Sequence, residues 1–323
     1  MAETANIAAM AEKISQEIFS EFGWSIFGPC NENSDCVYEQ HKLRTHPTDV
    51  VFYYQHPYSN KTVYINTDLK SYKSESISKA AVGGAISSLA KAVECCQVSS
   101  TWQSRYSIPG RNKEIVGLLF IYNHDGNYDK SFPALLETVH RDNFKIRKGS
   151  KFFILGPEAI CYLKTLATDM KSLRGDGILP AKDQYYFYYP ELYQKKLIRE
   201  QNSSATFEIL CGPWQIIRYK KPNSKDGLLV YLRSKGDTVE EFQYFIDYLF
   251  SYQLIQEMSE IKIRIPYADN AAISNFQRAK ASYEMMIGTE VDQGQQRLSK
   301  LTCESVTTVY TQYSTIEIGM RNA

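Results

Sequence analysis

Two aspartates and a lysine stand in an arrangement that could bind a metal ion and activate a water molecule. Asp49 begins one strand-like run, and Asp68 and Lys70 lie at the end of the next one. Carboxylate oxygens are hard ligands of the kind that magnesium and manganese ions prefer. A lysine two residues after a carboxylate lies on the same face of a strand, because side chains alternate between faces. The three residues could therefore hold a divalent cation and orient the water that attacks a phosphodiester.

A carboxylate followed two residues later by a lysine is by itself a weakly specific pattern. The surrounding segments decide which of its occurrences is the candidate site. The pattern occurs at Asp68–Lys70, Asp169–Lys171 and Glu260–Lys262. The second falls in a helical pattern, where residues two apart do not face each other. The third leads into a strand, but a long helix precedes it. Only the first follows a hairpin that carries an upstream aspartate, Asp49.

The segments around these residues predict alternating helices and strands. Apolar residues at three- and four-residue spacing, together with a proline in a first helical turn, predict helices over 6–22, 78–97 and 157–173. Apolar, β-branched and aromatic runs predict strands over 24–27, 49–54, 62–68, 114–122 and 151–155. The polar stretch 31–48 is expected to be a loop or an irregular strand. The chain is thus expected to belong to the α/β class.

The length of 323 residues favours two domains over one. A break at Arg174–Gly177 places the predicted boundary near residue 175, which gives domains over 1–175 and 176–323. The second domain is expected to be α+β, and the chain as a whole shows no internal repeat. Its predicted strands cover 206–210, 214–219, 228–232 and 261–265, and its predicted helices cover 239–258 and 271–286.

Composition indicates a globular protein without a membrane span. Hydrophobic residues make up 43% and charged residues 23%, and no apolar run approaches the roughly 18 residues that cross a bilayer. The first residues lack the pattern of a targeting peptide, so the cytoplasm is the expected compartment. The seven cysteines form no CxxC pair, which indicates reduced thiols rather than a zinc or disulfide framework. A site in which His41 and His46 share a metal with Asp49 is the weaker hypothesis.

Pro47-Thr48-Asp49, followed by Asp68-Leu69-Lys70 and the helix over 78–97, resembles the PD-(D/E)XK nuclease superfamily. The resemblance covers roughly residues 1–175. It implies a restriction-endonuclease-like core of a helix, three strands, a helix and a strand, with magnesium or manganese as cofactor. In many members a glutamate of the first helix completes the metal site. Its spacing from the following glycine and aromatic residue favours Glu12, and Glu17 remains the alternative.

The resemblance also implies an activity and a setting. The expected reaction is endonucleolytic cleavage of DNA, with RNA as an alternative substrate. The chain resembles nuclease subunits of bacterial anti-phage defence systems, which often work beside a second protein, and oligomers are possible. The C-terminal domain would then choose the substrate or the partner. In the alternative hypothesis the domain keeps the nuclease fold but only binds a nucleic acid or a protein, without catalysis. The presence of all three residues, Asp49, Asp68 and Lys70, argues against this alternative.

A net charge of +1 means that a nucleic acid must be held by local basic surfaces. Basic residues gather in 141–151 and 218–225, although such runs often only keep loops soluble. The candidate phosphate contacts are Lys73, Arg147, Lys148, Lys151, Arg218, Lys220 and Lys221. The aromatic run 184–189 could stack on bases, but burial in a sheet is the favoured interpretation.

Overall fold

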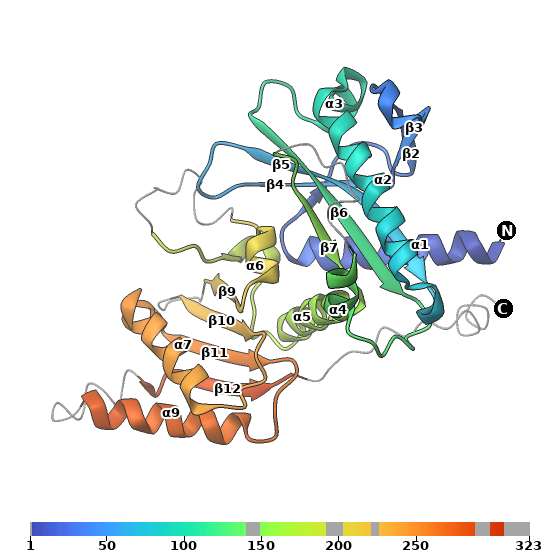
Figure 1. Cartoon of the computed structure of the whole chain (residues 1–323). Helices are drawn as coiled ribbons and strands as arrows, with labels where there is room; N and C mark the ends of the chain where they lie inside the picture. The colour runs from blue at the N-terminus through green and yellow to red at the C-terminus, as the bar shows by residue number, and fades with distance from the viewer. Residues whose placement is uncertain (1, 140–148, 192–202, 221–225, 288–297, 307–323) are drawn as a thin grey trace. The chain divides into compact units, whose positions relative to one another are not determined.

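The computed structural model describes residues 2–139, 149–191, 203–220, 226–287 and 298–306. These residues form two compact units, which divide the chain between Lys164 and Thr165. Each unit contains a five-stranded sheet with helices beside it (Figure 1). None of the helices in this part of the chain is both long enough and apolar enough to cross a membrane.

The first unit has a mixed sheet in the order β1-β4-β5-β6-β7. The two pairs from β1 to β5 are antiparallel, and the two pairs from β5 to β7 are parallel. A separate hairpin, β2 with β3, precedes β4. The elements are α1 Ala2–Glu21, β1 Ser25–Ile26, β2 Glu32–Asp35, the 3-10 helix η1 Glu39–His41, β3 Thr45–Thr48, β4 Val50–Gln55, β5 Thr62–Tyr72, the 3-10 helix η2 Ser74–Ser76, α2 Lys79–Val98, α3 Ser100–Tyr106, β6 Lys113–Asn123, α4 Phe132–Thr138 and β7 Phe152–Leu155.

Helices α1 and α2 cover opposite faces of this sheet. The ring of Phe19 on α1 lies 6.1 Å from that of Phe120 on β6. A Cβ added to Gly117 on the same strand would come within 2.7 Å of Val93 on α2. Residues 117 and 120 point to opposite faces because strand side chains alternate. Gly117 therefore gives α2 the room to approach the sheet closely.

The second unit has a sheet in the order β12-β11-β10-β9-β8. Its two pairs from β8 to β10 are antiparallel, and its two pairs from β10 to β12 are parallel. Helix α5, Pro157–Gly175, runs across the division between the units. The elements that follow it are the 3-10 helix η4 Lys182–Gln184, β8 Tyr185–Phe187, α6 Phe207–Cys211, β9 Trp214–Tyr219, β10 Gly227–Leu232, α7 Val239–Ser251, α8 Leu254–Glu257, β11 Glu260–Ile265, α9 Ala272–Ile287 and β12 Leu301–Ser305.

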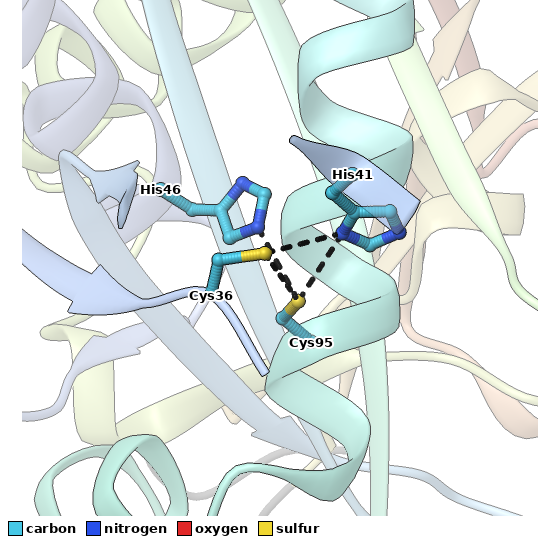
Figure 2. Close-up of side chains that lie close together, drawn as sticks. All are labelled: Cys36, His41, His46 and Cys95. Atoms are coloured by element: carbon cyan, nitrogen blue, oxygen red, sulfur yellow. Dashed lines mark hydrogen bonds between the residues drawn. The ribbon is translucent and has the colours of Figure 1, made fainter. Parts of the chain in front are cut away.

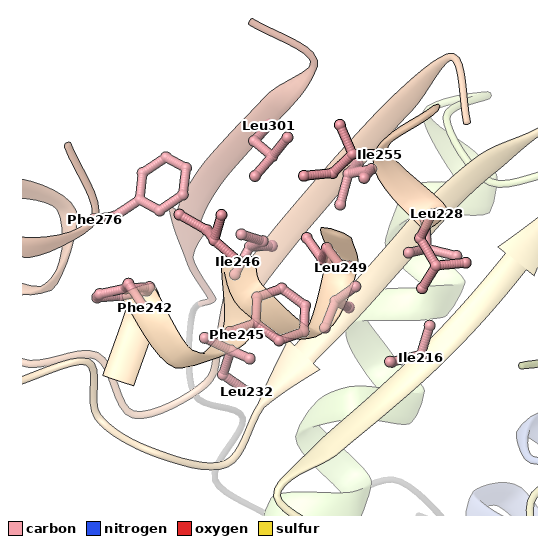
Figure 3. Packing of buried hydrophobic residues seen from close by; sticks show 14 of the residues in the cluster. Ile216, Leu228, Leu232, Phe242, Phe245, Ile246, Leu249, Ile255, Phe276 and Leu301 are labelled. Carbon is pink, nitrogen blue, oxygen red and sulfur yellow. The ribbon is translucent and has the colours of Figure 1, made fainter. Parts of the chain in front are cut away.

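The core of the second unit lies between this sheet and the helices α7 and α9. Leu228 and Leu232 of β10 and Ile216 of β9 meet Phe245 of α7 and Phe276 of α9 (Figure 3). Burial of such side chains contributes about 1.5–3 kcal/mol each to stability, before the entropy of ordering is subtracted.

The two units share one order of elements, although the sequence shows no repeat. In each, an edge strand is followed by an antiparallel hairpin, a helix, a parallel strand, a second helix and a last parallel strand. The helices that connect the parallel strands are α2 and α4 in the first unit and α7 and α9 in the second. The similarity is therefore one of topology, and the sequence carries no repeat that would mark it.

Most predicted elements are confirmed, and the departures have local causes. The strand predicted over 206–210 is wrong, because the Thr206 side chain accepts a hydrogen bond from the Ile209 amide and begins the short helix α6. The helix predicted over 239–258 is two helices, separated at Gln253, whose φ is 58°. The aromatic residues 185–189 are buried, as the favoured interpretation expects. The boundary near residue 175 stays a prediction.

Candidate active site

The structure brings Asp49 and Asp68 together where the hairpin of β4 and β5 ends. The last ladder pair joins Val50 to Thr67, and the Asp49 amide donates to the Thr67 carbonyl oxygen at 3.3 Å. Beyond that point the Asp49 side chain takes the place of a backbone acceptor. Its Oδ2 accepts a hydrogen bond from the Leu69 amide at 2.6 Å. This bond holds the Asp49 carboxylate beside the strand segment that carries Asp68.

Lys70 forms a close ion pair with Asp68, as their shared strand face leads one to expect. Its Nζ lies 2.5 Å from Asp68 Oδ1, and the two side chains are 29% and 5% exposed. The β5–β6 register places the pair beside Leu119 and Ile121, which pack against α2. Burial lowers the pKa of Lys70, but the charges of Asp68 and Asp49 and the bond to Asp68 raise it above its ordinary value. Lys70 is therefore a cation at neutral pH.

Asp49 is held in an environment that disfavours its negative charge. Burial is the largest cause that raises its pKa above the ordinary value, and the charges of Asp68 and Glu12 raise it further. The Leu69 amide and Lys70 act in the opposite direction without cancelling the shift. A bound cation would relieve this repulsion, and the oxygen donors suit a hard divalent metal.

Asn66 is a site residue that the sequence analysis missed. It lies two residues before Asp68 on the same strand, so their side chains share a face. It is 1% exposed, and neither its side-chain oxygen nor its side-chain nitrogen has a hydrogen-bond partner in the described part of the chain. Buried amides normally have partners. Asn66 is thus a polar group suited to contact a bound water or cation beside Asp68.

The structure separates the two glutamates of α1. Glu12 Oε2 accepts a hydrogen bond from Asn31 Nδ2 at 3.0 Å, and the Asn31 amide donates to the Asp49 carbonyl oxygen at 2.7 Å. Asn31, in the left-handed region with φ of 58°, thus links Glu12 to Asp49. Glu17 instead pairs with Lys164, whose side chain is 9% exposed. Glu12 lies near the aspartates but, within the described ranges, does not close with them into a compact ligand cluster.

The other two triplets have structural partners in the second unit. Arg264 binds both carboxylate oxygens of Asp169, at 2.6 and 2.7 Å, and the Tyr231 hydroxyl donates to the same carboxylate. Glu260 accepts a hydrogen bond from the Tyr219 hydroxyl at 2.6 Å and lies 3.5 Å from Lys262. Both carboxylates are therefore held by structural contacts within the second unit.

Two of the candidate phosphate contacts are held in ion pairs. Lys151 lies 2.6 Å from Glu114, and Arg218 lies 2.9 Å from Asp226 and 3.7 Å from Glu257.

The remaining candidates differ in what the structure describes. Lys73 and Lys220 are exposed, and they stay candidates for phosphate contact. Arg147, Lys148 and Lys221 lie outside the described residues.

A second cluster of ligand-type side chains was not found in the sequence. Cys36, His41, His46 and Cys95 place their sulfur and ring nitrogen atoms within 4.8 Å of one another (Figure 2). The cysteine spacing hides this cluster, because Cys95 lies on α2, far along the chain from Cys36. The only local signal is a cysteine followed by two histidines at equal intervals of five residues. Burial, with the charges of His41 and Lys91, lowers the pKa of His46 to about 4.

Comparison with known proteins matches one region of the chain. Residues 1–159 match the family model described as the GAPS4 protein PD-(D/E)XK nuclease domain. No curated protein and no solved structure matches the chain significantly. The match covers the helix, the hairpin with Asp49 and Asp68, the helix α2 and the strands β6 and β7. Residues 1–159 therefore belong to the PD-(D/E)XK nuclease superfamily and resemble the nuclease domain of the GAPS4 protein.

Proposed function

We propose that the chain is a magnesium- or manganese-dependent endonuclease that cuts DNA in anti-phage defence, beside a partner subunit. The observation that carries the proposal is the meeting of Asp49, Asp68 and Lys70 at one end of a hairpin, inside the region that matches a nuclease family. Nucleases of this superfamily generally use divalent metals. The carboxylates, the charge repulsion at Asp49 and the buried amide of Asn66 all suit such an ion.

The roles of the side chains follow from their contacts. Asp49 and Asp68 would hold the cation, with Glu12 as the third carboxylate. When bound, the cation supplies Lewis-acid activation of the phosphodiester and lowers the pKa of a water molecule. Lys70, kept protonated by Asp68, places a positive charge where negative charge grows on the phosphate. Asn31 holds Glu12 and the backbone of Asp49 in fixed relation.

The second unit is proposed to recognise the substrate or the partner and to take no part in cleavage. In the first unit, the residues of β5 that face α2 include Asp68 and Lys70. In the second unit, the residues of β10 that pack against α7 are apolar: Leu228, Val230 and Leu232. Strand β10 of the second unit holds the position that β5 holds in the first. Unlike β5, it has no ionisable side chain on the face that packs against the following helix. We therefore assign substrate or partner recognition to residues 176–323.

The direct test is cleavage by the purified full-length chain. Plasmid, linear duplex DNA and single-stranded RNA are incubated with magnesium, manganese, calcium or a chelator, and Asp68→Asn serves as the inactive control. Cleavage of DNA that requires magnesium or manganese and disappears in the control supports the proposal. Cutting of RNA alone would reassign the substrate. Binding without cutting under every condition would indicate the silent binding module.

The glutamates of α1 should differ in the kind of damage that their replacement causes. Glu12→Gln is expected to lower cleavage about 10-fold or more with little change in melting temperature, because it removes a metal-binding charge. Glu17→Gln is expected to lower the melting temperature and change activity less, because Lys164 then loses a carboxylate partner in a buried position. Thermal melts and initial rates measure both effects. The reverse pattern would move the third carboxylate to Glu17.

If the C-terminal domain helps to bind the substrate, the N-terminal domain alone should bind DNA weakly. Residues 1–175 should fold alone but bind DNA more weakly than the full chain, about 10-fold or more at moderate salt. The reason is that Lys151, one of the candidate phosphate contacts of the first unit, is offset by Glu114. Circular dichroism and DNA binding at two salt concentrations measure this. Equal binding by the truncated chain at both would refute it, and an unfolded truncation would show that the boundary is misplaced.

A further inference from the structure

The hairpin of β2 and β3 reaches the candidate active site without an apolar core of its own. Between residues 25 and 49 no apolar side chain is buried, and the buried residues are Ser34, His41, His46 and Thr48. Val37 and Leu43, at the connection between the strands, are 46% and 47% exposed. Small substructures with so little apolar burial usually need a disulfide or a metal to hold one conformation.

Three side chains of this region and one of helix α2 meet at one point. Cys36 follows β2, His41 ends η1, His46 lies in β3, and Cys95 comes from α2 (Figure 2). Cys36 Sγ lies 3.8 Å from Cys95 Sγ and 3.5 Å from His41 Nδ1. Cys95 Sγ lies 3.5 Å from His41 Nδ1 and 3.3 Å from His46 Nε2.

These separations are those of the corners of a tetrahedral zinc site. With Zn–S of about 2.3 Å and Zn–N of about 2.0–2.1 Å, a regular tetrahedron has edges of about 3.8 Å between sulfurs and about 3.5 Å between sulfur and nitrogen. The distances in the structure, 3.8 Å between the sulfurs and 3.3–3.5 Å from sulfur to nitrogen, agree with these edges. A disulfide would need the sulfurs at about 2.05 Å.

The surroundings of His41 also fit metal binding. Its Nδ1 faces the two sulfurs, and its Nε2 lies 3.1 Å from Glu94 Oε2 on α2. A carboxylate that accepts the second ring N–H fixes the tautomer and orientation of metal-bound histidines. The Glu94 side chain is 17% exposed and the His41 side chain 6%, so this contact is largely shielded from water.

We propose that Cys36, His41, His46 and Cys95 bind one structural zinc ion, separate from the catalytic cation. Two thiolates and two imidazoles are a donor set typical of zinc, and four protein ligands leave no position for a substrate. Each thiol releases its proton on binding, so one zinc displaces two protons. The ion joins the hairpin to α2, and because Asp49 follows His46 by three residues, it fixes the strand that delivers Asp49 to the active site.

Metal analysis of the full-length chain, purified without chelators, tests the proposal. Mass spectrometry of the metals is expected to find about one zinc per chain. Cys95→Ser and His46→Ala should lower the zinc content at least 10-fold. Cys211→Ser, which changes an exposed thiol, and Asp68→Asn, which changes the catalytic set, should keep it. Wild-type protein that lacks zinc and takes up none on addition, or ligand variants that keep it, would overturn the proposal.

Cobalt(II) gives a readout that does not depend on how well the variants fold. Wild-type chain loaded with cobalt should show the intense visible bands of tetrahedral coordination and a sulfur-to-cobalt charge-transfer band, and zinc should displace them. Weak octahedral bands without charge transfer would place the ion on oxygen ligands and overturn the assignment. Thiols are counted in the denatured protein in parallel. Two thiols fewer than the seven in the sequence, without zinc, would indicate a Cys36–Cys95 disulfide instead.

Zinc removal should also loosen the hairpin. A chelator is expected to lower the melting temperature and to raise hydrogen exchange over residues 31–48, and zinc but not magnesium should restore both. Restoration by magnesium alone would contradict a zinc-specific site.

Discussion

Lys70→Ala is expected to lower metal-dependent cleavage by about 10²- to 10⁴-fold, the range for loss of a positioned charged group in the transition state. The lysine is held 2.5 Å from Asp68 and is kept protonated by its carboxylate neighbours. Its charge is therefore available where the phosphate gains negative charge. The measurement is the single-turnover rate on plasmid at saturating magnesium. Cutting at the wild-type rate would show that the site assignment is wrong.

Lys262→Ala is the matched control for this change. Lys262 also follows a carboxylate by two residues on a strand, lies 3.5 Å from Glu260, and has the same 29% exposure of its side chain as Lys70. It should leave the cleavage rate within about twofold, the range of a surface substitution away from the site. The stability effects should differ as well. Lys70→Ala leaves the nearly buried Asp68 without its cation, which should cost about 1–3 kcal/mol of unfolding free energy.

The sequence was sufficient to predict that the strand residues of the candidate site lie together, and the reason is geometric. Side chains of a strand alternate between its two faces, so Asp68 and Lys70 share one face. The hairpin brings this second strand back beside the start of the first, where Asp49 lies. The choice between Glu12 and Glu17 could not be made in the same way. Their different partners, Asn31 and Lys164, come from other parts of the chain and appear only when it folds.

Two larger features were beyond local sequence patterns. The proposed zinc ligands Cys36 and Cys95 are 59 residues apart in the sequence, so no short spacing marks them. The repeated topology is hidden because the matching strands carry different side chains, polar at Asp68 and apolar at Val230. Backbone hydrogen bonding and the crossover of parallel strands define such a fold, and many sequences satisfy both.

Asp49→Asn is expected to lower the cleavage rate by about 10²-fold or more and at the same time to stabilise the protein. Burial, with the charges of Asp68 and Glu12, raises the pKa of Asp49. The folded state therefore holds the Asp49 proton more tightly than the unfolded state, and stability falls as the pH rises through the raised pKa. A neutral amide avoids this cost while its oxygen can still accept the Leu69 amide bond. At pH 7 we expect a melting temperature higher by roughly 2–4 °C, the shift that about 1 kcal/mol produces in a domain of this size.

The pH dependence makes this expectation specific. Below the ordinary aspartate pKa of about 3.9 the carboxyl group is protonated in both states, so the advantage of Asp49→Asn should disappear. Asp125 provides the opposite control. Burial raises its pKa, but bonds from the Ser74 amide, the Asn123 side chain and the Asn127 amide lower it overall. Asp125→Asn should thus lower the melting temperature at pH 7, and its cost should fade as the pH falls.

Magnesium separates electrostatic repulsion from other causes of stabilisation. An ion that binds only the folded state raises the melting temperature of the protein, by an amount that grows with the ratio of the ion concentration to its dissociation constant. Magnesium should therefore stabilise wild-type protein, in which it relieves the repulsion at Asp49, and should stabilise Asp49→Asn much less. The melting temperatures of the two proteins should converge as the magnesium concentration increases. Equal stabilisation of both by magnesium would mean that Asp49 is not a ligand, and an Asn variant less stable than wild type at pH 7 would mean that its carboxylate is not strained.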